Sequence, residues 1–146
     1  QYPWPFEDSS VQAVVSNHFI EHIPHYRPEY QGVDGFWMFF NELYRICKKE
    51  ATVPLTCPYG KSDRAIWDPS HTRAIHEMNF SYLVPEWLQA QGLDHYPITA
   101  NFEVVMMEGQ GVPEQIMNRN AEYQAEARSF YWNALSDLLV ILKAIK

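Results

Sequence analysis

The sequence predicts an α/β fold, in which a sheet of at least three strands packs against helices. Short β-branched runs alternate along the chain with segments whose apolar residues recur every three or four positions, and this order of strands and helices is typical of layered α/β domains. Of the 146 residues, 47% are hydrophobic and only 20% are charged, which is the composition of a globular chain. A chain of this length is expected to form a single domain, residues 1–146, around one core.

The first predicted strand, residues 11–15, leads directly into a polar segment that carries histidines. Ser16 and Asn17 supply turn and helix-cap chemistry, and a short helix over residues 18–23 ends at Pro24. Open α/β folds bind their ligands outside the carboxyl ends of the strands. The end of this first strand is therefore where we expect the functional site.

The other elements follow from the same signals. Residues 36–49 have the apolar spacing of an amphipathic helix, and residues 51–57 that of a second strand, in which Pro54 argues for a bulge or an edge position. Beyond a polar segment over residues 61–79, the predicted elements are a helix over 80–91, a strand over 95–108 and a long C-terminal helix over 120–145.

Charge and cysteine content exclude several classes of protein. The formal net charge of −7 argues against strong binding to nucleic acid phosphates or to anionic lipid. No apolar run reaches the ~18 to 20 residues of a membrane span, so we expect a soluble, cytoplasmic protein. Cys47 and Cys57 have no C-x-x-C spacing, and they predict neither a disulfide framework nor a cysteine zinc site.

The segment PWPFEDSSVQAVVSNHFIEHI, followed by NELYRICKK and ATVPLTCPYG, resembles the second half of a class I S-adenosylmethionine-dependent methyltransferase. In that family a loop of the form Pro-Phe-x-Asp-x-Ser precedes strand four, a segment ending in Glu-His follows it, and an amphipathic helix leads to strand five. The resemblance covers roughly residues 3–59. The matching positions are Pro5, Phe6, Asp8, Ser10, Glu21, His22, Glu42, Leu43, Arg45, Lys48 and Lys49.

The resemblance implies a partial Rossmann-like methyltransferase sheet with flanking helices. The family's first three strands are absent, together with the glycine-rich turn after strand one and the acidic residue that holds the ribose, and no G-x-G-x-x-G precedes Val11. The chain also opens on Gln1 rather than on Met. We therefore expect a methyltransferase-like domain that is truncated at its N-terminus.

By resemblance, the cofactor is S-adenosylmethionine. The sulfonium already activates the methyl group, so the protein must mainly align donor and acceptor and, where needed, take a proton. The resemblance places Pro5 and Phe6 beside the adenine, and Ser16, Asn17 and His18 beside the methionine moiety. The acceptor is an unidentified small molecule.

The loop over residues 68–73 supplies the candidate catalytic residues. It follows the second predicted strand and could reach the same sheet edge, where His71 could act as general base and Arg73 could hold a carboxylate or phosphate of the acceptor. Asp68 completes this candidate set. The alternative is a structural turn in which Asp68 caps the following segment and Arg73 pairs with Asp68.

Residues 18–22 also spell H-x-x-E-H, the inverted zinc-peptidase signature. In that interpretation His18 and His22 bind zinc and Glu21 is the base, which would make the protein a zinc hydrolase. Pro24 ends the helix within a turn of His22, so we expect exposed histidines in a loop and no bound metal.

A methyltransferase, or the C-terminal part of one, is therefore the preferred function. A non-catalytic oligomeric or binding module is the alternative, since the donor site is incomplete. The first strand, 11–16, would have an open apolar edge, which invites pairing with another chain, so we expect a homo-oligomer.

Overall fold

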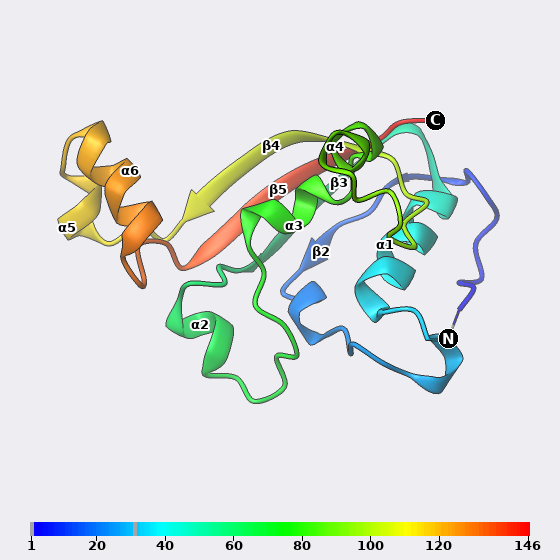
Figure 1. Cartoon of the computed structure of the whole chain (residues 1–146), viewed down its shortest axis with the longest axis horizontal. Coiled ribbons are helices and arrows are strands. Elements are labelled where there is room, and N and C mark those ends of the chain that lie inside the picture. The colour runs from blue at the N-terminus through cyan, green and yellow to red at the C-terminus, as the bar shows by residue number, and fades with distance from the viewer. Residues whose placement is uncertain (1, 31) are drawn as a thin grey trace.

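The computed structural model describes residues 2–30 and 32–146, and in this part of the chain five strands form one sheet (Figure 1). The order across the sheet is β1-β3-β5-β4, and β2 also pairs with β3. β1 and β2 run parallel to β3, whereas β5 is antiparallel to both of its neighbours. The predicted α/β fold is confirmed. The strands are β1 (Val11–Ala13), β2 (Ser16–Asn17), β3 (Cys47–Pro58), β4 (Phe102–Gln110) and β5 (Asp137–Ala144).

The helices connect these strands in chain order. The 3-10 turns η1 (Ile20–His22) and η2 (Pro28–Tyr30) and the helix α1 (Gly35–Ile46) join β2 to β3. Three short helices, α2 (Asp63–Ile66), α3 (Glu77–Ser81) and α4 (Pro85–Gln91), lie between β3 and β4. The helices α5 (Glu114–Met117) and α6 (Ala121–Phe130) lie in the β4–β5 connection and extend beyond one end of the sheet (Figure 1).

The helix α1 is the element that the sequence predicted best. The Asp34 side chain caps it by accepting a hydrogen bond of 2.7 Å from the Phe36 N–H. One face of the helix is buried, through Phe36, Phe39, Phe40, Leu43 and Ile46. The helix ends three residues earlier than predicted, because the chain turns at Cys47 directly into β3.

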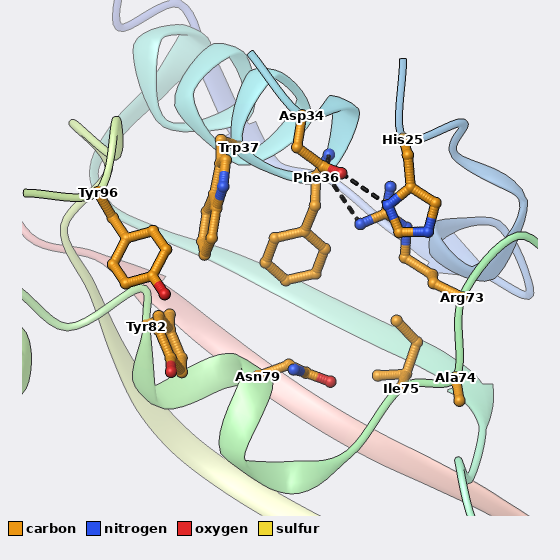
Figure 2. Close-up of a pocket in the computed structure, with 10 residues that line it drawn as sticks. All are labelled: His25, Asp34, Phe36, Trp37, Arg73, Ala74, Ile75, Asn79, Tyr82 and Tyr96. Carbon is orange, nitrogen blue, oxygen red and sulfur yellow. Dashed lines mark hydrogen bonds and ion pairs between the residues drawn. The ribbon is translucent and has the colours of Figure 1, made fainter. Parts of the chain in front are cut away.

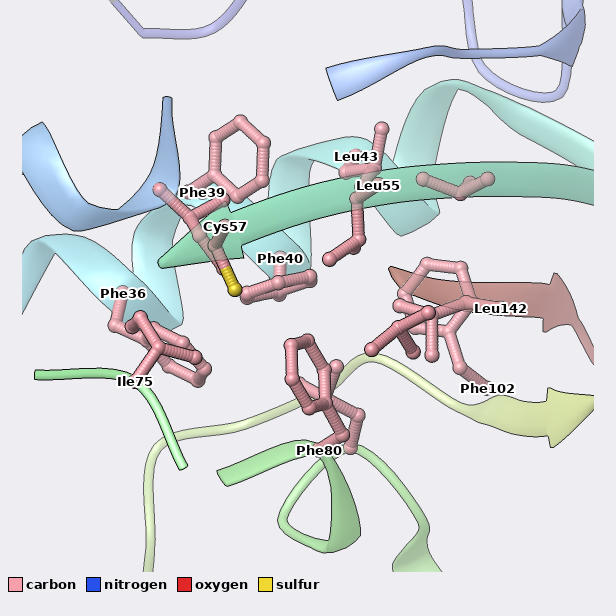
Figure 3. Packing of buried hydrophobic residues seen from close by; sticks show 14 of the residues in the cluster. Phe36, Phe39, Phe40, Leu43, Leu55, Cys57, Ile75, Phe80, Phe102 and Leu142 are labelled. Carbon is pink, nitrogen blue, oxygen red and sulfur yellow. The ribbon is translucent and has the colours of Figure 1, made fainter. Parts of the chain in front are cut away.

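The hydrophobic core lies between the sheet, α1 and α3 (Figure 3). Phe40 and Leu43 of α1 and Phe80 of α3 are fully buried against Leu55 of β3 and Leu142 of β5. Burial alternates along β5, where every second side chain is only partly covered. One face of the sheet therefore carries the core.

Pro54 lies opposite the break between β1 and β2. The carbonyl oxygens of Thr52 and Thr56 accept hydrogen bonds from the Val14 and His18 N–H groups, so the backbone of Pro54 faces the same side of β3. Proline has no N–H to donate there, which explains why the first predicted strand is divided into two short pieces. The prediction of a bulge or an edge position at Pro54 was wrong, because β3 is a central strand and pairs with β5 in regular register through Pro54.

The prediction of a long C-terminal helix was wrong. The helix α6 covers Ala121–Phe130 only, and residues 137–144 form the strand β5. The run DLLVILKA is apolar throughout, and in such a short run helical spacing cannot be distinguished from a buried strand. Pairing of β5 with both β3 and β4 determines the outcome.

Two smaller differences have local causes. The predicted helix over 80–91 is divided into α3 and α4, because Pro85 lacks the N–H that a continuous helix needs and occupies the first turn of α4. The strand predicted over 95–108 begins only at Phe102. Among the described helices, none has the length and apolar character needed to cross a membrane.

Candidate functional site

The candidate site lies at the carboxyl ends of β2 and β3. These strands are parallel, with Asn17 opposite Thr56, so their ends meet at one edge of the sheet. The first residue of β5, Asp137, pairs with Pro58, the last residue of β3, and so lies at the same edge. His18 follows β2 with a φ of 46°, a left-handed conformation that is uncommon for a residue with a side chain. Backbone strain of this kind occurs at functional sites.

Hydrogen bonds hold the loop over residues 68–73, which follows β3 in the chain, against the turn that follows β2. The Thr72 N–H donates to the Glu21 carbonyl oxygen at 2.8 Å, and the Thr72 hydroxyl donates to the Ile23 carbonyl oxygen at 2.6 Å. The Arg73 guanidinium donates two further hydrogen bonds to that Ile23 carbonyl, at 3.1 and 2.9 Å. The loop over residues 68–73 therefore holds its side chains against η1.

Two buried carboxylates face the site. The Glu21 residue is 1% exposed, and its Oε1 lies 3.4 Å from His18 Nδ1. On the other side of that imidazole, His18 Nε2 lies 3.8 Å from Asp137 Oδ1. Within the described ranges, neither oxygen of Glu21 has a hydrogen-bond partner, and neither does Oδ1 of Asp137. Two acidic groups thus face the exposed His18 ring from buried positions.

His22 and His71 complete the cluster. Their rings contact each other edge to face with centroids 4.7 Å apart, and His22 Nε2 lies 4.0 Å from Glu21 Oε1. His22 Nδ1 lies 3.1 Å from the Ser70 hydroxyl oxygen, and His71 Nδ1 lies 3.1 Å from the Ala65 carbonyl oxygen. Each imidazole is therefore oriented by a hydrogen bond at Nδ1, which leaves its Nε2 facing the cluster.

The cluster lines a small cavity of about 180 Å³. Arg64 and Trp67 form part of its wall, and Arg64 donates a hydrogen bond of 2.7 Å to Asp137 Oδ2. Burial, together with the charges of Glu21 and Asp137, raises the pKa of the Cys57 thiol beneath this edge. The cavity is thus lined by carboxylates and imidazoles, with one guanidinium near its rim.

The predicted catalytic residues occupy different places. Asp68 and His71 lie in the cluster, with His71 Nε2 3.8 Å from Asp68 Oδ2. Asp68 also forms the structural turn given as the alternative, because it accepts a hydrogen bond of 2.8 Å from the Ser70 N–H. Hydrogen bonds from the Ser70 hydroxyl and N–H lower the pKa of Asp68.

Arg73 lies apart from this cluster. Its side chain is 10% exposed and pairs with Asp34 at 3.0 Å, not with Asp68 as the structural alternative expected. Its contacts with Ile23 and Asp34 account for all three guanidinium nitrogens. A role in holding the acceptor stays a prediction for this residue.

Arg73 borders a second cavity, of about 370 Å³, between α1 and α3 (Figure 2). At one end of the cavity the Asp34 carboxylate forms hydrogen bonds with both His25, at 2.7 Å, and Arg73. At the other end three aromatic rings contact one another, those of Trp37, Tyr82 and Tyr96. Burial acts to raise the pKa of Asp34, but hydrogen bonds from Phe36, His25 and Arg73 outweigh it and the pKa is lowered. The charged groups of this cavity are thus paired with one another, since Asp34 bonds both His25 and Arg73.

The residues expected to bind the cofactor are not all near each other. Ser16, Asn17 and His18 lie at the carboxyl end of β2, and the Ser16 hydroxyl is buried without a partner among the described residues. Phe6 lies at the opposite end of β3, where its carbonyl oxygen accepts a hydrogen bond of 2.9 Å from Arg45, one residue before the end of α1. Pro5 precedes Phe6 in the same loop. The cofactor roles of Pro5 and Phe6 stay predictions.

Sequence reasoning missed Asp137 and Arg64 as site residues. Asp137 fell inside the wrongly predicted C-terminal helix, and only the insertion of β5 beside β3 brings it to the site. Arg64 was one polar residue among many in the segment over 61–79. No local signal distinguished either residue.

The geometry also bears on the H-x-x-E-H interpretation, which needs His18 and His22 one helical turn apart on a helix. His18 instead precedes η1 in a left-handed conformation, and η1 spans only Ile20–His22. The Nε2 atom of His18 faces Asp137 rather than His22. The zinc-hydrolase alternative is therefore not favoured.

Comparison with known proteins identifies the fold. No family model matches the chain, and no curated protein matches it. A solved S-adenosylmethionine-dependent methyltransferase from Archaeoglobus fulgidus is similar to the chain with a TM-score of 0.59 and 17% identity, over 94% of this chain and 61% of that one. A methyltransferase of the same kind from Methanosarcina mazei gives a TM-score of 0.51 and 13% identity, over 97% and 62%.

A third similar structure is the complex of the Haloferax volcanii Trm112 methyltransferase activator with its proposed methyltransferase. Its TM-score is 0.52 at 13% identity, over 97% of this chain and 57% of that one. The chain therefore spans 57 to 62% of the length of these three proteins. At such low identity the similarity concerns the fold, and the fold of this chain is that of the class I S-adenosylmethionine-dependent methyltransferases.

Proposed function

We propose that this chain forms part of an S-adenosylmethionine-dependent methyltransferase and carries the side of the active site at which the acceptor binds. The observation that supports this most strongly is the convergence of His18, Glu21 and Asp137 at the carboxyl ends of β2 and β3. In an open α/β sheet this edge is where ligands bind. Because the chain shares its fold with methyltransferases, methyl transfer is the reaction that we assign to this edge of the sheet.

The donor side of the proposed site is the end of β2. Ser16 has a buried hydroxyl without a partner in the described chain, and a cofactor atom could satisfy it. Asn17 and His18 follow at the strand end. S-adenosylmethionine, when bound, would supply an activated methyl group, so the residues here need only orient it.

The 146 residues contain neither the glycine-rich turn nor a ribose-binding acid after a second strand, as the resemblance would require. We therefore propose that a second copy of the chain completes the donor pocket. The edge position of β1 supports the expected homo-oligomer. Size-exclusion chromatography that gives a monomer would contradict it.

An imidazole of the cluster would take a proton from an acceptor that must lose one. The sequence pointed to His71, but the geometry favours His18. Its side chain is 41% exposed and lies between oxygens of Glu21 and Asp137 that have no hydrogen-bond partner among the residues that the structure describes. A carboxylate beside an imidazole stabilises the imidazolium that forms on protonation. The acceptor class that suits this site is a small molecule with an O–H or N–H group.

Calorimetric titration with S-adenosylhomocysteine tests the proposal on this chain. We expect micromolar binding, weakened about fivefold to tenfold in Ser16→Ala by the loss of one hydrogen bond. Ser129→Ala is the matched control, because Ser129 lies on α6 and donates within its own helix. Wild-type protein that binds no S-adenosylhomocysteine would contradict the proposal and favour the non-catalytic binding module.

A further inference from the structure

We propose that Glu21, His22 and His71 bind one divalent transition-metal ion at the edge of the sheet. One ligand atom from each residue lies within 4.8 Å of the others. In tetrahedral coordination with bonds of ~2.1 Å, ligand atoms are about 3.4 Å apart, so side-chain movements of up to about 1.4 Å would close the site. The site does not depend on methyl transfer.

The first argument is the state of Glu21. Only 1% of the Glu21 residue is exposed to solvent, and neither of its carboxylate oxygens has a hydrogen-bond partner in residues 2–30 or 32–146. Buried carboxylates are normally paired with a cation or hydrogen-bonded, because burial removes their hydration. Glu21 lines the same cavity as His22 and His71, and within the described part of the chain its ion-pair contacts are with His18 and His22, not with an arginine or a lysine. A metal ion in that cavity would supply the missing partner.

The second argument is the protonation of the two imidazoles. The Ala65 carbonyl oxygen can only accept, so the hydrogen bond to it places a proton on Nδ1 of His71. The Ser70 hydroxyl donates to Asp68 at 2.6 Å, and it therefore accepts from His22 Nδ1. Both neutral rings then present the lone pair of Nε2 to the cluster. Support of this kind for the distal nitrogen is characteristic of histidines that bind metals.

The ligand set indicates the class of metal. Two imidazoles and one carboxylate suit zinc, cobalt, iron or manganese, whereas magnesium prefers oxygen ligands and bound water. Three protein ligands leave a coordination position open, which the cavity of about 180 Å³ could fill with water or an acceptor oxygen. The sequence alone led us to expect no metal, because Pro24 ends the helix that would carry His18 and His22. His71 is 49 residues beyond His22, and it is the hydrogen bonds of Thr72 to Glu21 and Ile23 that bring it to the site.

The test is metal binding by the full chain after dialysis against EDTA. We expect one equivalent of zinc per chain by elemental analysis after gel filtration, a cobalt complex with visible absorption bands, and no displacement of cobalt by millimolar magnesium. Glu21→Gln and His71→Ala should each weaken zinc binding at least tenfold. Ser70→Ala, which removes the orienting partner of His22, should weaken it about tenfold. His95→Ala is the matched control, because His95 is exposed and stacks on Tyr96.

A second measurement separates loss of metal from loss of fold. Zinc should raise the melting temperature of the wild-type protein and of His95→Ala, but not that of Glu21→Gln, even where the metal-free variant melts at the wild-type temperature. Less than a tenth of an equivalent of zinc and cobalt on the wild-type protein would overturn the proposal. Zinc binding that is unchanged in Glu21→Gln and His71→Ala would also overturn it. Binding of S-adenosylhomocysteine is measured separately, so failure of either proposal is distinguishable from failure of the other.

Discussion

Replacing Arg73 tests whether this residue holds the site together or is free to bind an acceptor. The guanidinium is 10% exposed and makes three hydrogen bonds, two to the Ile23 carbonyl and one to Asp34. A hydrogen bond that involves a charged group contributes about 1.5 to 3 kcal/mol. Both partners keep other donors when Arg73 is removed, since Thr72 bonds the Ile23 carbonyl and His25 bonds Asp34. We therefore expect Arg73→Met to lower the free energy of unfolding by about 2 kcal/mol, below the sum of the three bonds.

Urea unfolding followed by tryptophan fluorescence measures this change, and the five tryptophans of the chain supply the signal. In thermal unfolding the same loss corresponds to a fall in Tm of about 6 °C for a chain of this size. Arg27→Met, at an exposed arginine in the loop before α1, is the control and should stay within about 0.5 kcal/mol of the wild type. If Arg73→Met were as stable as this control, the structural role would be refuted and the guanidinium would be available for an acceptor anion.

Three further substitutions test the fold. Leu142→Ala, at a fully buried position of β5, should cost about 3 kcal/mol in urea unfolding, and a cost under 1 kcal/mol would contradict the core described above. Gly35→Ala should lower the free energy of unfolding by about 2 kcal/mol in the same assay, because a Cβ there would collide with the Pro24 carbonyl oxygen. If the variant were as stable as the wild type, the loop at Pro24 would have to move aside without cost. Hydrogen bonds from Arg45 lower the pKa of Glu42 against the effect of burial, so the stability that Glu42 contributes is present above its ordinary pKa of 4.5 and is lost as the pH falls through the lowered value. Stability curves from pH 7 to pH 3 should therefore fall less steeply for Glu42→Gln than for the wild type, and parallel curves would count against this ion pair.

Local sequence signals predicted the elements in which the burial pattern is clear. The apolar spacing from Phe36 to Ile46 matches one buried helix face, and it predicted α1 to within three residues at its end. The segment Asp137–Ala144 has no such distinction, because its consecutive apolar residues suit a helix and a strand equally. Its pairing with β3, for example Leu55 opposite Val140, is a contact between distant parts of the sequence. Spacing within a window of residues cannot reveal that contact.

The same limit explains what the sequence predicted about the site. Its position at the end of the first strand could be predicted, because β2 and β3 are parallel and open sheets bind ligands at that edge. The partners of His18 could not be predicted, because Asp137 lies at this edge only as the first residue of β5, which pairs with β3. The H-x-x-E-H spacing assumed a helix that would pair His18 with His22, whereas the backbone of His18 is left-handed. The pair that forms is His22 with His71, through hydrogen bonds of Thr72 to the backbone of η1.

The position of β5 also explains why this edge is a place for chemistry and not only for packing. By starting beside Pro58, β5 brings the Asp137 carboxylate close to His18, on the side of the ring away from Glu21. Two buried carboxylates near one strand end favour positive charge between them, and the candidates are an imidazolium at His18 and a metal ion at His22 and His71. These two positions use different histidines but share Glu21, so a metal ion bound by Glu21 would leave Asp137 as the carboxylate that stabilises a proton on His18. If the proton acceptor and the metal ion are both present, removing the metal should leave binding of S-adenosylhomocysteine at Ser16 intact. It should change only the groups that the acceptor contacts on the other side of the cavity.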